Sequence, residues 1–303
     1  MNNYINFILL IILIILIKSN LKKFHKKKKF IIVNRKLILN KVKIFKNKKV
    51  IILNNVLNNP NYCLKFLLNN FNYLNSDPSN YPGNRINTPI KLKKEIIQLM
   101  LLMNKKHYKF EGNIYVSDLF FSIINKPKNE LTLKNVFPHR DCSEFNDHKK
   151  SGLAIVIYLC KPNNNYGGTK IYNSKYPIFS REFRTDKKYK DVYNKYINLS
   201  NNLSYDTKFD DFFDLIYNCK LEFNKGIIYP TDYFHKADIT NNYFTNNNTN
   251  NNPRYTLTGF LFFDKNKKSD VYNTNNDDLD FKLMNDWYID GSENKVINPE
   301  YYL

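Results

Sequence analysis

Apolar and polar positions divide the chain into a mainly helical first part and a strand-rich second part. An apolar run at 49–53 predicts a short buried strand. The sequence Asn-Pro-Asn at 59–61 opens an amphipathic helix that includes Leu67, because proline fits the first turn of a helix. Apolar residues at helical spacing predict a second helix over 91–103, and the turn-rich stretch 76–88 predicts a loop before it.

β-Branched and aromatic residues become frequent further along the chain and predict a series of strands. The predicted strands cover residues 115–125, 136–141, 152–160, 169–172, 225–230, 233–237 and 254–264. Two helices followed by six or more strands predict an α+β fold built on a β-sandwich or a barrel. A jelly-roll, which is a double-stranded β-helix, with flanking helices is the leading candidate for this fold.

We predict three parts along the chain. Residues 1–29 form a hydrophobic signal or anchor segment with a basic linker, 30–264 form the jelly-roll domain, and 265–303 form a polar C-terminal tail. Within the domain, 177–222 predicts a polar, helix-containing insertion, and the Asn-rich stretch 241–252 predicts a low-complexity loop. The predicted apolar face of the insertion consists of Phe209, Phe212, Phe213, Leu215 and Ile216.

An unbroken apolar run at 7–17 precedes a lysine-rich segment at 18–29. As a helix, the eleven residues of this run would span roughly 16 Å, which is short of a hydrocarbon core of about 30 Å. The length fits the apolar core of a signal sequence, and an uncleaved anchor with lysines at one end is the alternative. We therefore expect membrane association or entry into the secretory pathway, with the endoplasmic reticulum as the expected compartment. The sequence does not determine on which side of the membrane the domain lies.

Composition narrows the classes of protein to which the chain can belong. Its 303 residues carry a formal net charge of +20 at pH 7, which is typical of proteins that bind nucleic acids or membranes. The abundant Lys, Asn, Ile, Tyr and Phe all have A/T-rich codons, however, so a coding bias explains the charge and we do not expect nucleic acid as a partner. The four cysteines include no Cys-x-x-Cys pair, which argues against a zinc ribbon and against a disulfide-dense scaffold.

Three residues have the types and the spacing of an iron centre. His139 and Asp141 are two positions apart, and alternate residues of a strand point to one face, so both side chains can reach one point. His235 supplies a third ligand from a later predicted strand. Two histidines and one carboxylate form the facial triad of non-haem Fe(II) oxygenases, which leaves three coordination positions open. A His-x-acid pair carries little weight alone, since it arises by chance in roughly a third to a half of such chains.

From residue 115 to residue 264 the chain resembles the Fe(II)- and 2-oxoglutarate-dependent dioxygenases, in particular their prolyl-hydroxylase-like branch. The segment Tyr158-Leu159-Cys160, followed by Gly167-Gly168, is similar to the Tyr-Leu-Asn and Gly-Gly segment of that branch. Arg254-Tyr255-Thr256-Leu257-Thr258, with the Phe-Phe-Asp that trails it, is similar to the last core strand. Two features depart from the branch: Cys160 stands in place of Asn, and the stretch between the last histidine and the arginine is lengthened by the Asn-rich loop.

The resemblance implies a role for each residue of the candidate site. It implies that the iron ligands, and thus the catalytic residues, are His139, Asp141 and His235. It also implies that Arg254 binds the distal carboxylate of 2-oxoglutarate and that Tyr158 donates its hydroxyl to the same carboxylate. A planar guanidinium suits this task because it donates two parallel hydrogen bonds. Thr256 lies on the same strand face as Arg254 and would add a hydroxyl donor.

We therefore expect a dioxygenase that hydroxylates an unidentified substrate, with Fe(II) as the metal and with 2-oxoglutarate and O₂ as cosubstrates. Ascorbate is a further candidate cofactor, and the branch favours a peptidyl side chain as the substrate by analogy. Two alternatives stay open. One is a catalytically inactive jelly-roll that binds a ligand or a partner, and the other is a basic, membrane-tethered protein that binds a polyanion. In the second case, the order of the histidines, the aspartate and the arginine would be a coincidence.

Overall fold

The computed structural model describes residues 33–34, 41–45, 48–70, 75–76, 81–126, 128–141, 150–160, 167–178, 181–199, 203–205, 207–239 and 253–264. The predicted membrane segment, Asn-rich loop and polar tail (1–29, 241–252 and 265–303) lie outside the described residues. Among the helices that the structure does describe, none has both the length and the apolar character needed to cross a membrane. The division into domains and the cellular location therefore stay predictions.

Helices and antiparallel strands make up a mixed α+β fold, as expected. The strands are β1 (Lys41–Phe45), β2 (Lys48–Leu53), β3 (Asn75–Ser76), β4 (Gly83–Asn87), β5 (Asn113–Ile124), β6 (Lys150–Tyr158), β7 (Gly167–Ser174), β8 (Phe213–Lys220), β9 (Gly226–Pro230), β10 (Phe234–Ala237) and β11 (Arg254–Asp264). The α-helices are α2 (Pro60–Asn69), α3 (Ile90–Met103), α4 (Leu133–Val136), α5 (Arg181–Thr185) and α6 (Lys190–Asn198). Shorter helical turns are η2 (Asn104–Tyr108), η3 (Lys128–Glu130) and η4 (Lys187–Tyr189).

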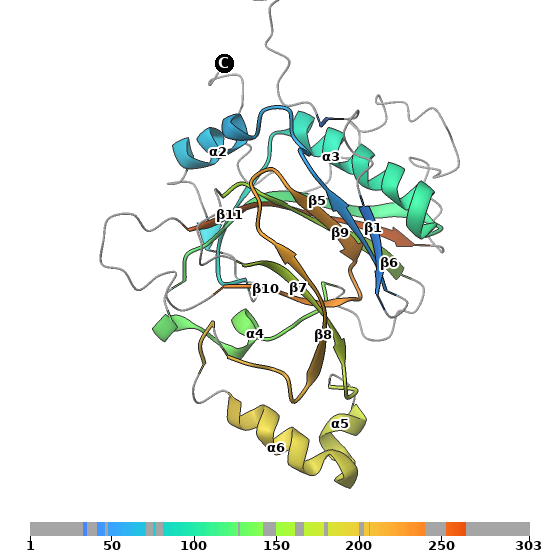
Figure 1. Ribbon diagram of the computed structural model, residues 1–303, viewed down its shortest axis with the longest axis vertical. Helices are drawn as coiled ribbons and strands as arrows, with labels where there is room; N and C mark the ends of the chain where they lie inside the picture. Colours follow the sequence, from blue (N-terminus) through green and yellow to red (C-terminus); the bar gives the residue numbers. More distant parts are fainter. Residues whose placement is uncertain are drawn as a thin grey trace, which may run out of the picture.

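Two antiparallel sheets carry the fold. The larger sheet has the strand order β1-β2-β9-β6-β11-β5-β4-β3, and the smaller sheet has the order β10-β7-β8. Helices α2 and α3 cover one face of the larger sheet, the smaller sheet lies on its other side, and α5 and α6 lie beyond the smaller sheet (Figure 1). The inner faces of the two sheets are therefore available to form a site between them.

From β5 onward the chain crosses repeatedly between the two sheets, while β7 and β8 follow one another within the smaller sheet. Strands β5, β6, β9 and β11 belong to the larger sheet, whereas β7, β8 and β10 belong to the smaller one. Between β5 and β6 the chain also pairs with the smaller sheet at one residue, because His139 forms an isolated antiparallel bridge with His235 of β10. These crossings bring residues that are distant in sequence onto facing surfaces.

Strand β11 separates the hydrophobic core from the space between the sheets. Leu257 and Leu261 lie on the face that packs against helix α3, and both are fully buried. Arg254, Thr256 and Thr258 alternate with these leucines along the strand, so they point to the opposite face, toward the smaller sheet. All three are buried as well, although they are polar. Buried polar groups require partners, so this face is suited to form a site.

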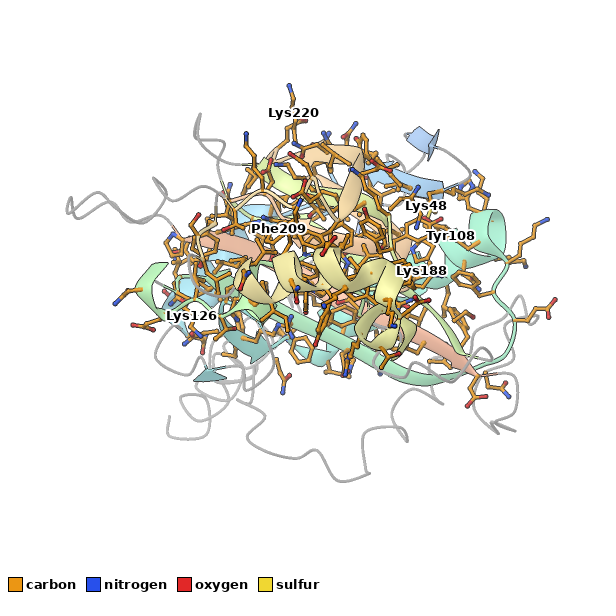
Figure 2. All side chains as sticks on the ribbon, turned by 90° about the horizontal axis from the view of Figure 1, so that it is seen from below. Lys48, Tyr108, Lys126, Lys188, Phe209 and Lys220 are labelled. Atoms are coloured by element: carbon orange, nitrogen blue, oxygen red, sulfur yellow. The ribbon has the colours of Figure 1, made fainter. Side chains whose placement is uncertain are left out.

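An aromatic cluster supports the segment that leads to His139. The ring of Phe137 makes edge-to-face contacts with Phe209 at 5.1 Å and with Phe213 at 5.2 Å between ring centroids. Such aromatic pairs contribute about 0.5–1.5 kcal/mol each beyond their buried area. Phe209 lies inside this part of the molecule, whereas the side chain of Lys220 projects outward (Figure 2).

Local sequence sets the start of helix α2. The side chain of Asn59 accepts a hydrogen bond from the N–H of Tyr62 at 3.2 Å, and Pro60 occupies the first helical position. The prediction of this helix is confirmed. Also confirmed are the second helix and the strands predicted at 49–53, 115–125, 152–160 and 254–264, within a few residues at their ends.

Two predictions of secondary structure are wrong, and a third is incomplete. The stretch 136–141 is not a strand, because α4 ends at Val136 and the stretch joins a sheet through His139 alone. The predicted loop at 76–88 contains β4, and the insertion predicted at 177–222 contains helices, α5 and α6, as expected, but also the strand β8. In both cases the segment is extended because it pairs with a neighbour, β5 for β4 and β7 for β8. Pairing of this kind overrides the local pattern.

Candidate metal centre

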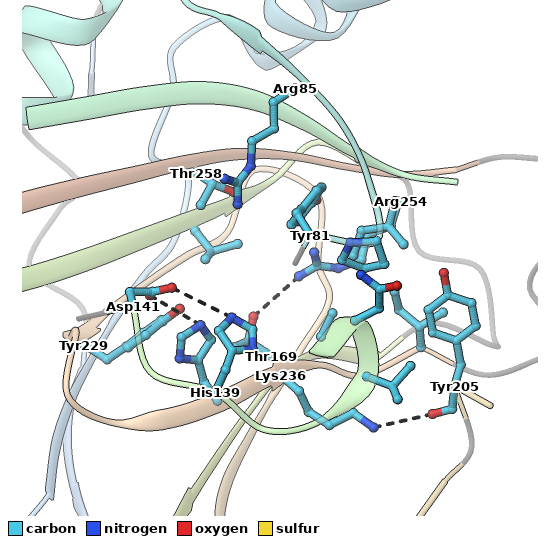
Figure 3. A pocket seen from close by; sticks show the side chains of 18 of the residues that line it. Tyr81, Arg85, His139, Asp141, Thr169, Tyr205, Tyr229, Lys236, Arg254 and Thr258 are labelled. Atoms are coloured by element: carbon cyan, nitrogen blue, oxygen red, sulfur yellow. Dashed lines mark hydrogen bonds and ion pairs between the residues drawn. The ribbon is translucent and has the colours of Figure 1, made fainter. Parts of the chain in front are cut away.

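Three predicted ligands converge between the two sheets. The ligand atoms of His139, Asp141 and His235 all lie within 4.8 Å of one another. Oδ1 of Asp141 is 3.8 Å from Nε2 of His139, and its Oδ2 is 3.4 Å from Nε2 of His235 (Figure 3). The structure thus brings together residues from two segments that are far apart in sequence.

Backbone hydrogen bonds hold the three ligands in place. The N–H of His139 donates to the carbonyl of His235 at 3.0 Å, and the N–H of His235 donates back at 2.9 Å. The N–H of Asp141 donates to the carbonyl of Thr231 at 3.0 Å. His139 and Asp141 are therefore both hydrogen-bonded to the stretch 231–235, which includes the second histidine, His235.

The ring nitrogens of both histidines are arranged as in a metal site. Nδ1 of His139 is 3.4 Å from the carbonyl of Phe137, and Nδ1 of His235 is 3.0 Å from the carbonyl of Tyr233. Because a carbonyl oxygen can only accept, each contact assigns the proton of a neutral ring to Nδ1. Each Nε2 then presents a lone pair toward Asp141. Metal-bound histidines donate their second ring N–H to carbonyl groups in the same way.

The local electrostatics favour a bound cation. Burial raises the pKa of Asp141 to about 6 and lowers the pKa of His235 to about 4. The pKa of His139 is lowered by burial and by the neighbouring His235, although 49% of the His139 side chain is exposed against 9% for His235. No described residue donates a hydrogen bond to Oδ2 of Asp141, which is buried. Two nitrogen lone pairs and a carboxylate without a donor among them fit a divalent cation.

A pocket adjoins these three residues and opens between the sheets. It encloses about 670 Å³ of space between protein atoms, part of which is open to solvent. Its lining includes the three candidate ligands, Arg254 and Thr258 of β11, Thr169 of β7, and Tyr81 and Arg85.

Arg254 faces the same pocket as the candidate ligands. It is 4% exposed, and its Nη2 donates to the carbonyl of Gly168 at 3.1 Å and lies 3.5 Å from Oγ1 of Thr169. Its Nε is buried and makes no hydrogen bond with a described residue. A buried guanidinium with an unused donor is suited to bind a carboxylate from the pocket.

The other two predicted cosubstrate residues lie one layer behind the pocket wall. The hydroxyl of Tyr158 donates to Oγ1 of Thr169 at 2.9 Å, and Tyr158 is fully buried. Oγ1 of Thr256 is 3.2 Å from Oγ1 of Thr258. Among the described residues, Thr169 and Thr258 line the pocket, whereas Tyr158 and Thr256 do not.

Sequence reasoning missed several polar residues that line the pocket. Thr258 could have been found from its position, because it lies two residues after Thr256 and thus on the same strand face. Thr169 directly follows the Gly-Gly pair of the predicted hairpin, where a short polar side chain gives no distinct pattern. Tyr81 and Arg85 belong to the stretch predicted to be a loop, so no sequence pattern places them at the site.

Comparison with solved structures gives several likenesses of low sequence identity. A prolyl-4-hydroxylase from Pseudomonas putida has 11% identity and a TM-score of 0.40, with 72% of this chain and 93% of that chain covered. The non-heme alpha ketoglutarate dependent carbocyclase SnoK from nogalamycin biosynthesis has 12% identity and a TM-score of 0.43, with coverage of 72% and 80%. The epimerase SnoN from the same biosynthesis has 9% identity and a TM-score of 0.42, with coverage of 72% and 79%.

A search of the curated proteins gives no match to this sequence. One family model matches residues 36–261, which is most of the chain. The chain therefore belongs to DUF6445, a family of unknown function.

Proposed function

We propose that this protein is an Fe(II)- and 2-oxoglutarate-dependent dioxygenase of the hydroxylase type. One observation carries the proposal: Nε2 of His139, Nε2 of His235 and the carboxylate of Asp141 converge within 4.8 Å, with lone pairs and negative charge directed at one another. Such a set is unfavourable without a cation. It has the composition of the facial triad that binds Fe(II) in oxygenases.

The fold supports the same proposal. We assign β5, β6, β9 and β11, together with the His139 segment, β7, β8 and β10, to a jelly-roll, because the chain crosses between the two sheets between all consecutive segments except β7 and β8, which pair within the smaller sheet. The candidate ligands lie on the segments of the smaller sheet, and Arg254 lies on the larger sheet opposite them. In this arrangement both sheets contribute to one pocket.

His139, Asp141 and His235 would hold the metal and leave three positions open, which suffice for a bidentate 2-oxo acid and O₂. With 2-oxoglutarate and O₂ present, Fe(II) held by these residues would supply the oxidative decarboxylation of 2-oxoglutarate to succinate and CO₂, in which one oxygen atom of O₂ enters succinate and the other enters a substrate C–H bond. Because Asp141 occupies a ligand position, no further position remains for a halide. Hydroxylation is therefore favoured over halogenation.

Arg254 would bind the distal carboxylate of 2-oxoglutarate, and Thr169 would assist it. The hydroxyl of Tyr158 donates to Oγ1 of Thr169, so the hydroxyl hydrogen of Thr169 is left to donate to another acceptor. Oγ1 of Thr169 lies 3.5 Å from Nη2 of Arg254, so both groups can reach one carboxylate. Tyr158 would then act by orienting Thr169 and not by touching the cosubstrate, and Thr256 would act in the same indirect way through Thr258.

The remaining parts of the proposal follow from the sequence. The primary substrate is unidentified, a peptidyl side chain is favoured by analogy, and ascorbate is a candidate for keeping the iron reduced. Residues 1–29 would direct the protein to a membrane or to the secretory pathway, with 30–264 as the oxygenase domain and 265–303 as its tail.

Turnover without a primary substrate tests the proposal. Full-length protein is incubated with Fe(II), 2-oxoglutarate, ascorbate and O₂, and succinate is measured together with the metal content. We expect slow succinate formation by the wild type and none by a His139→Ala/Asp141→Ala variant that no longer retains metal. His107→Ala is the matched control, since it removes a histidine of η2 that lies outside the site. Equal metal content in the double variant and the wild type would contradict the proposal.

A further inference from the structure

A second arginine, Arg85 of β4, lines the pocket together with Arg254 of β11. Both strands belong to the larger sheet, with β5 between them. Figure 3 shows the two guanidinium groups apart, with Tyr81 between them. The two cations therefore enter the pocket from one sheet at separate points.

Aromatic rings hold the guanidinium of Arg85 in one orientation. Its Cζ lies 4.2 Å from the centre of the Tyr81 ring and 5.5 Å from the centre of the Phe120 ring. A guanidinium stacked on a ring directs its N–H groups outward in the ring plane, where they can form two parallel hydrogen bonds with a planar anion. A lysine would not keep such an orientation.

Arg85 also belongs to a row of polar residues that crosses the inner face of the larger sheet. It pairs with Ser122 of β5, which pairs with Thr256 of β11, which in turn pairs with Tyr158 of β6. Ser122 is fully buried, and the hydroxyl of Tyr81, which lines the pocket, interacts with Ser122 and with Thr256. The polar row thus extends to the pocket wall, where it is suited to a polar ligand.

The charges of the filled pocket leave a surplus of positive charge. Asp141 is the one acidic residue among the described residues that line the pocket. With Fe(II) and the dianion 2-oxoglutarate bound, the charges of the metal, the cosubstrate, Asp141 and Arg254 cancel. Arg85 and Lys236 are the further cations of the described lining, and Nζ of Lys236 is directed at the carbonyl of Tyr205, 3.4 Å away. Of these two, Arg85 is the one whose cationic group lies over an aromatic ring of the pocket lining, that of Tyr81.

We propose that Arg85 binds an anionic group of the primary substrate, a carboxylate or a phosphate, and so selects acidic substrates for this site. The inference rests on the proposed function, because it assigns Arg254 to the cosubstrate. It names a substrate class that neither the ligand set nor the family match defines. A neutral or cationic substrate of the same size would lack this contact.

Binding of small anions to the loaded protein tests the inference. Full-length protein is saturated with Fe(II) and 2-oxoglutarate without O₂, so that Arg254 is occupied and no turnover occurs. Propionate and inorganic phosphate are then titrated at constant ionic strength and followed by ligand-detected NMR, with propanol and propylamine as probes that lack a negative charge. We expect one of the two anions to bind, and its affinity to fall roughly tenfold or more in Arg85→Gln. Preference for propionate would indicate a carboxylic acid as substrate, and preference for phosphate would indicate a phosphate ester.

Two further variants control for charge and folding. Lys220→Gln removes one positive charge from the exposed end of β8 and should leave anion binding unchanged. Arg85→Lys keeps the charge without the planar fork and should bind the anion with intermediate affinity. Melting temperatures of all variants identify any that do not fold. Equal anion affinity in the wild type and a folded Arg85→Gln variant would overturn the inference, as would the absence of anion binding by the loaded wild type.

Affinity for 2-oxoglutarate separates this inference from the proposed function. We expect Arg85→Gln to bind Fe(II) and 2-oxoglutarate like the wild type. If the variant instead loses 2-oxoglutarate and keeps the anion probe, Arg85 belongs to the cosubstrate site and the inference is wrong. If the wild type itself binds no 2-oxoglutarate, the proposed function fails. The anions are then titrated into the protein loaded with metal alone. Anion binding that is lost in Arg85→Gln would support the anion site, and the absence of anion binding would contradict it.

Discussion

His139 and His235 are paired by two backbone hydrogen bonds, of 3.0 and 2.9 Å, and their rings lie 4.5 Å apart between centroids. The pairing fixes the main chain of both residues, and Nδ1 of each ring also contacts a carbonyl oxygen. A site held in this way is preorganised, which reduces the cost of binding an ion. The predictions below follow from this preorganised but electrostatically unfavourable arrangement.

Asp141→Asn should stabilise the metal-free protein while it abolishes metal binding. Burial raises the pKa of Asp141 to about 6, above its unfolded value, so the stability that the acid contributes is lost as the pH rises through 6. Asn has the same shape and no charge, and at pH 8 it should raise the free energy of unfolding by roughly 1–3 kcal/mol. Urea unfolding at pH 8 and pH 4 measures the effect, and the gain should shrink at the lower pH. A metal-free variant less stable than the wild type at pH 8 would show that Asp141 has a stabilising partner.

Metal binding should be nearly constant from pH 8 to pH 6.5 and should weaken below pH 6. The pKa of His235 is lowered to about 4 by burial, so this imidazole stays neutral in the whole range and does not compete for a proton. Asp141, with a pKa of about 6, takes up one proton below that pH, so the affinity should fall by roughly tenfold per pH unit. Titration of the protein with Co(II) at several pH values measures this slope. A transition centred near pH 6.5 and involving two protons would mean that both imidazoles titrate normally.

Arg254→Lys should lower the affinity for 2-oxoglutarate without lowering the affinity for the metal. Arg254 is 4% exposed and its Nε has no partner among the described residues, so the loss of the planar fork should cost roughly tenfold or more in affinity. Calorimetric titration with 2-oxoglutarate measures the loss. 2-Oxobutyrate is the matched ligand, because it has the 2-oxo acid group and lacks the distal carboxylate. If the variant weakens both ligands equally, Arg254 does not bind the distal carboxylate.

Tyr158→Phe and Thr169→Val should both lower the affinity for 2-oxoglutarate, because both act through the hydroxyl of Thr169. The hydroxyl of Tyr158 donates to Oγ1 of Thr169, and of these two residues Thr169 lines the pocket whereas Tyr158 does not. Each variant should lower the affinity by a few fold, since a single hydrogen bond contributes about 0.5–1.5 kcal/mol. The double variant should bind 2-oxoglutarate with the same affinity as Thr169→Val alone, which a double-mutant cycle measures. Additive losses would instead place the hydroxyl of Tyr158 in direct contact with the cosubstrate.

The part of the fold that could be predicted from sequence is the part with regular periodicity. Strand β11 was predicted with its observed limits, because its buried face consists of apolar residues such as Leu257 and Leu261 at alternate positions. Strand β4, with the sequence Gly-Asn-Arg-Ile-Asn, contains a single large apolar residue, Ile86. It is extended because it pairs with β5, and no local pattern shows this pairing in advance.

The candidate site likewise contains residues that local sequence predicts and residues that only strand pairing places. His139, Asp141, His235 and Arg254 could be proposed from residue types and order, and the structure brings all four to one pocket. Their predicted roles await experiment. Residues that reach the pocket through pairing, such as Arg85, could not be found, because their position depends on which strands are neighbours.

The position of a bound metal tests the predicted centre most directly. Crystals of the protein are prepared with Fe(II) and 2-oxoglutarate without O₂, and anomalous differences are measured on both sides of the iron edge. We expect one peak per chain, bonded to Nε2 of His139, Nε2 of His235 and a carboxylate oxygen of Asp141, with the distal carboxylate of 2-oxoglutarate at Arg254. An iron peak elsewhere, or none between these three residues, would contradict the proposal.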